Sequence, residues 1–259
     1  MVTGDILGTR RWTHITEPSS EIPAEKLPML ESALERLQSG EPVQYVLGKA
    51  EFAGRTFKVG AGVLIPRPET EYMAIEALRL VESRKSVRVL DLYTGSGCLA
   101  WTLALGHPGA EVIGVDISEK ALEIARGQDF GTEMEASGAV APTFVRSDLL
   151  DLDSSFADGQ FDLILSNPPY IMEQEKPQMR INVLGFEPHE ALFVPDGDPL
   201  LHYRAVAAWS RRLLAPQGAG LSEINDRLGK ETLAVFRSAG FKNAEFLLDS
   251  EYQFRHILY

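Results

Sequence analysis

Short apolar segments alternate with helical patterns from residue 87 to the end of the chain. The segments 87–92, 111–115, 143–145, 161–165, 220–224, 243–248 and 252–259 predict strands, and 98–105, 118–127, 200–214 and 227–239 predict helices. This alternation predicts an α/β fold with a parallel, helix-covered sheet. Because ligands of such sheets bind beyond the carboxyl ends of the strands, the residues that follow each strand are candidates for a functional site.

The residues before this alternation follow other patterns. Leucines at spacings of three and four predict a helix over 25–38, with an apolar face made of Leu27, Leu30, Leu34 and Leu37. Apolar residues spread among glycines over 51–65 predict a β-hairpin. Pro68 can begin a helix, where its missing N–H has no cost, and apolar spacing continues that helix to Val81.

Charge and composition disfavour several kinds of partner and setting. The formal net charge of −12 repels phosphate backbones and disfavours direct binding to duplex DNA. Cys98 is the only cysteine, so no internal disulfide can form and we expect a reducing, cytoplasmic setting. The histidines are scattered without the spacing of a metal motif, so we expect no metal. No signal peptide pattern opens the chain and no apolar run is long enough to span a membrane.

A glycine-containing loop, "VLDLYTGSGCLA" (89–100), lies between a predicted strand and a predicted helix. The loop matches neither the dinucleotide-binding fingerprint nor a P-loop. This favours a cofactor that has no phosphate groups. Gly95 and Gly97 let the backbone approach a ligand closely. The Asp91 carboxylate can attract a cationic amine, directly or through water, while the amides of Thr94 to Gly97, Ser96 included, take a carboxylate. The alternative is a simple glycine turn between strand and helix.

Acidic residues follow the next two predicted strands. Asp116, with Ile117 beside it, lies 19 residues beyond Gly97 and can accept hydrogen bonds from both hydroxyls of a ribose. Its alternative role is to cap the helix that begins at Ser118. Asp148 could accept a bond from an adenine amino group and Leu149 could cover the ring, although a turn aspartate is the simpler interpretation. Jointly the three loops would hold S-adenosylmethionine.

The predicted strand 161–165 ends in Ser166 followed by Asn167-Pro168-Pro169-Tyr170. A planar nitrogen is a poor nucleophile, because its lone pair is delocalised. Two acceptors side by side, the Asn167 side-chain oxygen and the Pro168 carbonyl, can hold both of its hydrogens and turn its lone pair toward a methyl donor. The two prolines fix φ, and Tyr170 can stack on a flat amide or base. The alternative is a proline-rich turn.

Together, Asp-x-x-Thr-Gly-Ser-Gly and Asn-Pro-Pro-Tyr resemble the class I S-adenosylmethionine-dependent methyltransferases that modify planar nitrogens. With "GEPVQYVLGKAEFAGRTFKV" (40–59) and "VLIPRPETE" (63–71), the chain is similar to the HemK-type protein-(glutamine-N5) methyltransferases, which act on peptide chain release factors. The segments "EPHEAL" (187–192) and "YQFRHI" (252–257) also look like segments of that family. Tyr93 stands where many members have a smaller residue.

The resemblance implies a class I, Rossmann-like, seven-stranded methyltransferase domain over 67–259. It implies a linking β-hairpin over 49–66 and a helical, release-factor-docking domain over 1–48, which we expect to be shorter than the family's own. It further implies cofactor contacts at Thr94 to Gly97, Asp116, Leu149 and Asn167, with S-adenosylhomocysteine as product. The substrate glutamine, from a Gly-Gly-Gln loop, would lie against Asn167 to Tyr170, bordered by Arg67, Pro68 and Glu69.

Several alternatives remain open beside this hypothesis. Arg67 and Glu69 could simply pair with each other at a helix start. The same tetrad would serve an N6-adenine methyltransferase acting on DNA or RNA, although the acidic charge and "IPRPETE" speak against one. A related enzyme acting on a glutamine of a ribosomal protein is a further alternative, as is an idle cofactor-binding or RNA-binding module. We expect the protein to be a monomer.

Overall fold

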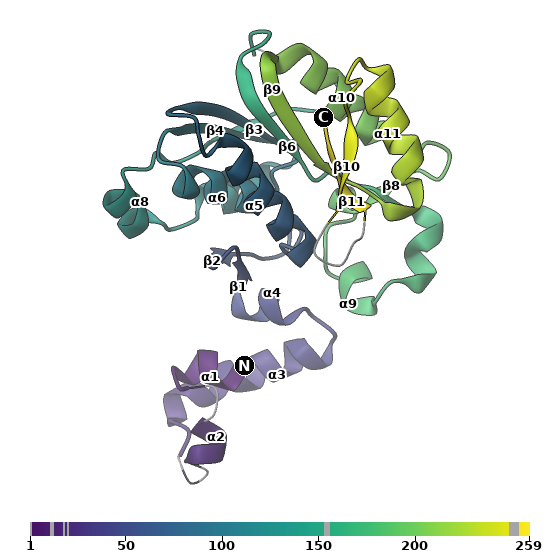
Figure 1. Cartoon of the computed structure of the whole chain (residues 1–259). Helices are drawn as coiled ribbons and strands as arrows, with labels where there is room; N and C mark the ends of the chain where they lie inside the picture. The colour runs from purple at the N-terminus through teal and green to yellow at the C-terminus, as the bar shows by residue number, and fades with distance from the viewer. Residues whose placement is uncertain (1, 11–12, 18, 20, 153–155, 249–253) are drawn as a thin grey trace.

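The computed structural model describes residues 2–10, 13–17, 19, 21–152, 156–248 and 254–259. A group of helices near the N-terminus stands apart from a larger unit of sheet and helices, and a short hairpin lies between the two (Figure 1). The larger unit carries every loop that follows a strand of the main sheet, so it positions the candidate site.

The main sheet has seven strands in the order β10-β11-β9-β6-β3-β4-β5. They are β3 (Val87–Leu92), β4 (Ala110–Asp116), β5 (Thr143–Arg146), β6 (Phe161–Ser166), β9 (Leu214–Glu223), β10 (Glu245–Leu248) and β11 (Phe254–Leu258). The pairs among β9, β6, β3, β4 and β5 are parallel, whereas β11 runs antiparallel to both neighbours. This topology confirms the predicted seven-stranded α/β fold of the class I type, but the sheet is mixed and not parallel throughout as the alternation predicted.

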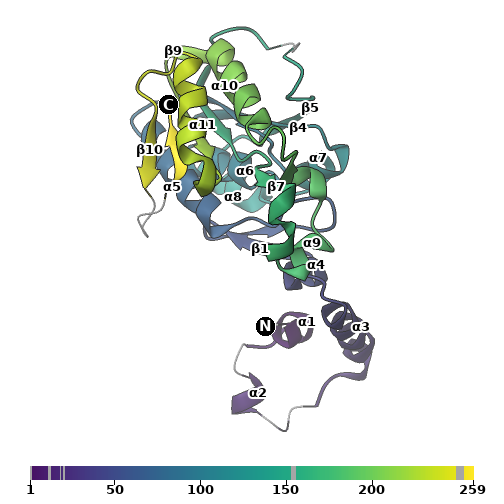
Figure 2. The same ribbon diagram turned by 90° about the vertical axis from the view of Figure 1, so that its right-hand side faces the viewer.

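Helices cover both faces of the sheet because its central strands bury both of their faces. The alternation of side chains along β3 sends Val87 and Val89 to one core and Leu90 and Leu92 to the other. The first core lies under α5 (Pro68–Val81), α6 (Cys98–Gly106) and α7 (Glu119–Arg126). The second lies under α10 (Leu201–Leu213) and α11 (Gly229–Ser238), which lie on the side that faces the viewer in Figure 2.

Strand β9 differs from the prediction at its start. We expected Pro216 and Gly218 to separate helix from strand, but β9 begins at Leu214, directly after α10. Proline is tolerated because Pro216 and Gln217 are exposed and fall where the pairing with β6 is irregular, between Phe161 and Leu163. Regular parallel pairing resumes at Ala219, and the strand is buried from Gly220 to its end at Glu223.

The N-terminal unit is helical, as predicted. It contains α1 (Val2–Leu7), α2 (Thr13–Thr16), a 3-10 turn at Ala24–Lys26, α3 (Leu27–Gln38) and α4 (Val43–Leu47), and it leads into the hairpin β1 (Lys49–Phe52) and β2 (Arg55–Lys58). The predicted leucine face of α3 is only partly buried. Leu30 is buried, but Leu27 and Leu34 are 42% and 53% exposed, because no element of the described chain packs over that part of the helix.

The chain between β6 and α10 forms structure that we did not predict. It contains β7 (Ile171–Met172), a 3-10 helix at Glu173–Gln178, α9 (Ile181–Leu184), a 3-10 turn at His189–Ala191 and β8 (Phe193–Val194). The two short strands pair in parallel with each other and not with the main sheet. A further short helix, α8 (Gly131–Ser137), was also missed. Elements of two to seven residues are too short to show a readable apolar period.

The packing where β9 pairs antiparallel with β11 can be tested by substituting Gly220. Gly220 exchanges backbone hydrogen bonds with Tyr259, and a Cβ placed on it would lie 2.2 Å from that tyrosine's ring. The ring cannot retreat, because it stacks on Phe236 with centroids 4.3 Å apart and its hydroxyl bonds Ser210. Gly220→Ala should therefore lower the free energy of unfolding by about 1–3 kcal/mol, measured by chemical denaturation.

Gly197→Ala is the matched control, because a Cβ there meets nothing within 4 Å and the residue is exposed. Its free energy of unfolding should stay equal to that of the wild type or rise slightly, since alanine restricts the unfolded chain. An equal loss of unfolding free energy in Gly220→Ala and Gly197→Ala would contradict the packing described between Gly220 and Tyr259.

Candidate active site

The carboxyl ends of β3, β4, β5 and β6 meet at one edge of the sheet and border a cavity of about 370 Å³. That volume lies within the range of small-molecule sites, roughly 300–1,000 Å³. The predicted residues on its wall are Arg67, Thr94, Gly95, Ser96, Asp116, Ile117, Asp148, Leu149, Asn167 and Pro169. The structure thus brings together residues from all three predicted cofactor loops and the start of the tetrad.

The glycine loop needs glycine at two positions for two reasons. Gly97 caps α6 in the left-handed region, with φ of 77°, and a Cβ on it would crowd Phe144 at 3.0 Å. Gly95 also has a positive φ, 55°, but a Cβ there would meet nothing within 4 Å. Gly95 therefore leaves open space beside a backbone that a ligand can approach. Gly97 lies behind the loop, packs on the core and does not reach the cavity wall.

Tyr93 opens this loop in a conformation that is unusual for its residue type. Its φ is 61°, in the left-handed region that a residue with a Cβ rarely adopts. The side chain lines the cavity, and its hydroxyl makes a 3.0 Å hydrogen bond with His202 Nδ1 at the start of α10. That bond holds the ring as part of the cavity wall.

Asp91 lies beneath the loop and not on the cavity wall where its predicted role would place it. It is fully buried, and its Oδ2 accepts hydrogen bonds from Thr94 Oγ1 at 2.6 Å and from the amide of Ala100 at 3.2 Å. Burial raises the pKa of its carboxyl to about 7. The geometry gives Asp91 a bracing role, because it ties the loop to the first turn of α6.

Asp116 braces the start of α7, the alternative considered for it, and its carboxylate also lies on the cavity wall. It lines the cavity, and its two carboxylate oxygens accept hydrogen bonds from the amides of Gly95 and Ser118, both at 2.9 Å. Ser118 itself caps α7, since its Oγ accepts from the amide of Ala121. Burial raises the pKa of Asp116. Each carboxylate oxygen has a further lone pair, so the residue can still accept hydrogen bonds from a ligand.

Asp148 and Leu149 form the wall beyond β5. Asp148 Oδ1 accepts from the amide of Leu150 at 2.9 Å, which is the turn geometry considered as its alternative. Leu149 is 3% exposed and lines the cavity, and its carbonyl accepts from the indole N–H of Trp209. The side chains of Leu149 and of Ile117, on the adjacent loop, form an apolar wall that could hold a flat ring.

Asn167 lies where two cavities meet. A second cavity of about 260 Å³ shares Leu64, Arg67, Asn167 and Ala191 with the first. Pro168 and Tyr170 line the second cavity, whereas Pro169 lines the first. The tetrad therefore forms the partition between two spaces, and its first residue contacts both.

A chain of hydrogen bonds lies behind the Asn167 amide, through two residues that we did not predict. Asn167 Nδ2 donates to Thr70 Oγ1 at 3.1 Å, and Thr70 Oγ1 donates to Glu223 Oε2 at 2.7 Å. Tyr170 Oη donates to the other carboxylate oxygen of Glu223 at 2.8 Å. Glu223 ends β9, so the signal that pointed to Asp116, an acidic residue at the end of an apolar strand, could have found it.

Of the three residues expected to border the substrate pocket at the start of α5, only Arg67 lies on a cavity wall. Pro68 is exposed and starts the helix, and Glu69 lines neither cavity. Arg67 pairs with Glu187 at 2.6 Å and not with Glu69. Glu187, within "EPHEAL", is buried and also accepts from the amide of Ile65 at 3.0 Å, so it joins the two loops that border both cavities.

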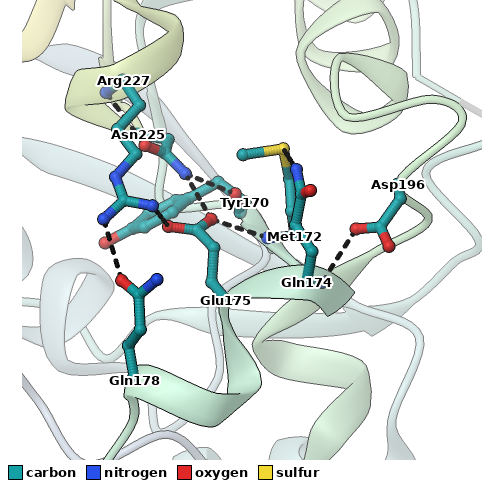
Figure 3. A network of polar contacts seen from close by, with 8 residues as sticks. All are labelled: Tyr170, Met172, Gln174, Glu175, Gln178, Asp196, Asn225 and Arg227. Atoms are coloured by element: carbon teal, nitrogen blue, oxygen red, sulfur yellow. Dashed lines mark hydrogen bonds and ion pairs between the residues drawn. The ribbon is translucent and has the colours of Figure 1, made fainter.

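A second polar network fixes the chain directly after the tetrad (Figure 3). Asn225 Nδ2 donates to the carbonyl of Tyr170 at 3.0 Å and to Glu175 Oε1 at 3.1 Å. Glu175 also accepts from the amide of Met172 at 2.9 Å and pairs with Arg227 at 3.1 Å. The loop after β9 therefore holds Tyr170 and the strand that follows it, which keeps the tetrad in one position.

The residues around the first cavity fit a cationic cofactor that has apolar and hydroxyl-bearing parts. Three carboxylates, those of Asp116, Asp148 and Glu190, line it against the single guanidinium of Arg67. S-adenosylmethionine carries a sulfonium and an amine beside an adenine ring and a ribose, so the donor set and the wall suit it. In the described part of the chain, no group of three or more potential ligands could hold a metal ion. No helix described in the structure has the length and apolarity needed to cross a bilayer.

Known proteins are similar to this chain in both of its parts. Residues 83–218 match the family model of a methyltransferase domain, and residues 1–48 match that of the PrmC N-terminal domain. A solved protein-(glutamine-N5) methyltransferase (release factor-specific) from Alicyclobacillus acidocaldarius is 28% identical, with a TM-score of 0.44, over 78% of this chain and 97% of that one.

Curated relatives match most of the chain. The release factor glutamine methyltransferase of Bacteroides thetaiotaomicron is 43% identical over 85% of this chain and 76% of its own length. The enzymes of the same name from Flavobacterium psychrophilum and Koribacter versatilis are 37% and 40% identical, over 91% and 86% of this chain and 81% and 76% of their own lengths. These identities confirm the resemblance drawn from the motifs, and the chain belongs to the release factor glutamine methyltransferase family.

Proposed function

We propose that this enzyme transfers the methyl group of S-adenosylmethionine to the side-chain amide nitrogen of the glutamine in the Gly-Gly-Gln loop of peptide chain release factors. The observation that carries the proposal is the position of Asn167 on the partition between two cavities. One cavity has the size and lining for the methyl donor, and the other, lined by Pro168 and Tyr170, suits a narrow amide side chain. The family relatives named for this reaction support the same substrate.

The cofactor, when bound, supplies an electrophilic methyl group on a positively charged sulfur. Thr94 to Ser96 would hold its amino-acid end, Asp116 its ribose, and Ile117 and Leu149 its adenine, since these residues line the first cavity. Asp91 would act on this end only indirectly, through Thr94 and the loop that it braces. The product of the transfer would be S-adenosylhomocysteine.

The tetrad would activate the substrate nitrogen by position alone. The Asn167 oxygen and the Pro168 carbonyl would accept the two N–H hydrogens of the glutamine amide. Both hydrogens would then tilt away and the nitrogen lone pair would turn toward the first cavity. Tyr170 would support the planar amide from the wall of the second cavity. No strong base is needed before attack, because the nitrogen would lose its proton, to solvent water, only after it has gained the methyl group and become strongly acidic.

Two alternatives use the same tetrad but receive less support. Methylation of adenine N6 in DNA or RNA would require a basic surface, whereas the net charge is −12 and carboxylates outnumber the one guanidinium at the cavity. Methylation of a glutamine in a ribosomal protein would need no change in the tetrad. Release factors are favoured over it because the relatives that match most of the chain are named for them.

The decisive experiment is mass spectrometry of a release factor after incubation with the enzyme and isotope-labelled S-adenosylmethionine. We expect one labelled methyl on the glutamine of the Gly-Gly-Gln loop. Asn167→Ala should lower the rate by about 100-fold or more, because a preorganised transition-state contact is lost. Asn243→Ala, at an exposed asparagine outside both cavities, is the control and should be as active as the wild type. A label on any other residue would refute the substrate assignment.

Asp116→Ala should weaken binding of S-adenosylhomocysteine by roughly tenfold or more in titration calorimetry, because ribose hydroxyls lose a charged acceptor. Thermal unfolding without ligand must be recorded in parallel, since Asp116 also braces Gly95 and Ser118. Asp129→Ala, at an exposed aspartate away from the cavity, should bind like the wild type. Unchanged affinity in the Asp116 variant would remove the ribose assignment.

We further propose that the helical unit over 1–48 docks the release factor. Its helix α3 exposes apolar side chains that the rest of the described chain does not cover, with Met29 and Leu34 being 54% and 53% exposed. Exposed apolar side chains gathered on one element are typical of an interaction surface.

Met29→Glu should raise the KM for the release factor about fivefold or more and leave kcat unchanged, because a buried charge would weaken docking without touching the tetrad. Ile75→Glu, on an exposed position of α5 outside the helical unit, is the matched control and should leave KM unchanged. If both variants behave alike, the docking surface lies elsewhere.

A further inference from the structure

The carboxylate of Glu223 joins two members of the tetrad from behind. It is 2% exposed, at the carboxyl end of β9, and accepts one hydrogen bond on each oxygen. One donor is the Tyr170 hydroxyl at 2.8 Å, and the other is the Thr70 hydroxyl at 2.7 Å. Thr70 in turn accepts from Asn167 Nδ2 at 3.1 Å, so α5, β9 and the loop that follows β6 meet in one chain of bonds.

The direction of these bonds follows from the chemistry of the groups. An ionised carboxylate can only accept, and a threonine hydroxyl has a single hydrogen. Thr70 must therefore give its hydrogen to Glu223 and can only accept from Asn167. The side-chain amide of Asn167 then has to turn its NH₂ group toward Thr70, which leaves its oxygen free for the cavities.

A neutral partner in place of the carboxylate removes this constraint. A protonated Glu223, or a glutamine at that position, could donate to the Thr70 oxygen. Thr70 would then donate its own hydrogen to the Asn167 oxygen, and the amide would rotate to present NH₂ to the substrate. Two N–H donors would face each other, so the glutamine amide would lose an acceptor that its activation requires.

We propose that Glu223, in its ionised form and acting through Thr70, is a positioning residue that fixes the orientation of the Asn167 amide and, by its second oxygen, the ring of Tyr170. This inference rests on the proposed function, because it specifies how the acceptor used on the substrate glutamine is held. It also gives a role to the threonine of "IPRPETE", which lies outside the direct substrate contacts predicted for that segment.

Several groups set the charge on Glu223. Burial raises the pKa of its carboxyl, and Glu69 raises it further, whereas the bonds from Thr70 and Tyr170 and the charge of Arg255 lower it. His256 Nε2 on β11 lies 3.9 Å from Oε2, and Tyr203 and Cys98 lie close enough to interact with the carboxylate charge. Because the pKa of Glu223 is raised, its ionised form should be lost at a higher pH than that of an exposed glutamate. The value of kcat should therefore fall as the pH is lowered through the pKa of Glu223.

Three variants test the chain of bonds with the release factor as substrate. Glu223→Gln keeps the shape and should lower kcat by about 100-fold or more, with KM within about threefold. Thr70→Val should do the same, whereas Thr70→Ser keeps the hydroxyl and should stay within about threefold of the wild type. The acid-side fall of kcat should remain in Thr70→Ser and disappear in Glu223→Gln.

The Asn167 side-chain amide provides a readout that needs no release factor. In ¹⁵N-asparagine-labelled enzyme its NH₂ signal is the one lost in Asn167→Ala. We expect that signal to shift in Glu223→Gln and Thr70→Val and to stay in place in Thr70→Ser. If circular dichroism shows that Glu223→Gln does not fold, the comparison of Thr70→Val with Thr70→Ser still tests the positioning role.

The positioning role of Glu223 and the proposed release-factor substrate can be refuted separately. An amide signal that is the same in all three variants, or a Thr70→Val enzyme with the kcat of Thr70→Ser, would overturn the positioning role. A wild type that leaves the release factor unmodified, while its Asn167 signal responds to the variants as expected, would refute the substrate assignment and support the positioning role.

Discussion

The site depends on one constraint, the parallel pairing of β3 with β4 and β6. Parallel strands in register end at the same edge, so Leu92 lies between Val115 and Ser166, and the residues that follow each strand come together. Asp116 and Asp148, which follow β4 and β5, are thereby placed on the wall of one cavity. The antiparallel β11 lies between β9 and β10 and puts His256 beside Glu223.

Two of the buried carboxylates, Asp91 and Glu223, orient residues of the site. Asp91 and Glu223 are both essentially inaccessible, and burial raises the pKa of both carboxyls. Each accepts hydrogen bonds from residues that line a cavity, Thr94 in one case and Tyr170 in the other. Desolvation of these two acids is unfavourable, but their hydrogen bonds hold the glycine loop and the tetrad in defined positions.

The sequence predicted the sheet and the residues of the cavity wall that directly follow its strands, because strand ends and loops are local features. It did not predict Thr70 and Glu223, whose hydrogen bonds join residues 97 and 153 positions apart. Asp91 was expected to attract a cofactor amine directly or through water; its side chain lies beneath the loop, and sequence position alone does not tell whether a strand-end side chain faces the cavity or the core. The short elements between β6 and α10 were missed because two-residue strands carry no apolar period.

The consecutive prolines of the tetrad acquire a specific meaning once both networks are considered. Asn167 is held from behind by Thr70, and the carbonyl of Tyr170 is held from the other side by Asn225. Pro168 and Pro169 join these two anchored residues with φ restricted in both, so the Pro168 carbonyl has little freedom between them. One acceptor is oriented by a hydrogen-bond chain and the other by covalent geometry. A planar nitrogen can therefore meet both acceptors without any rearrangement of the protein, which is the condition that catalysis by position requires.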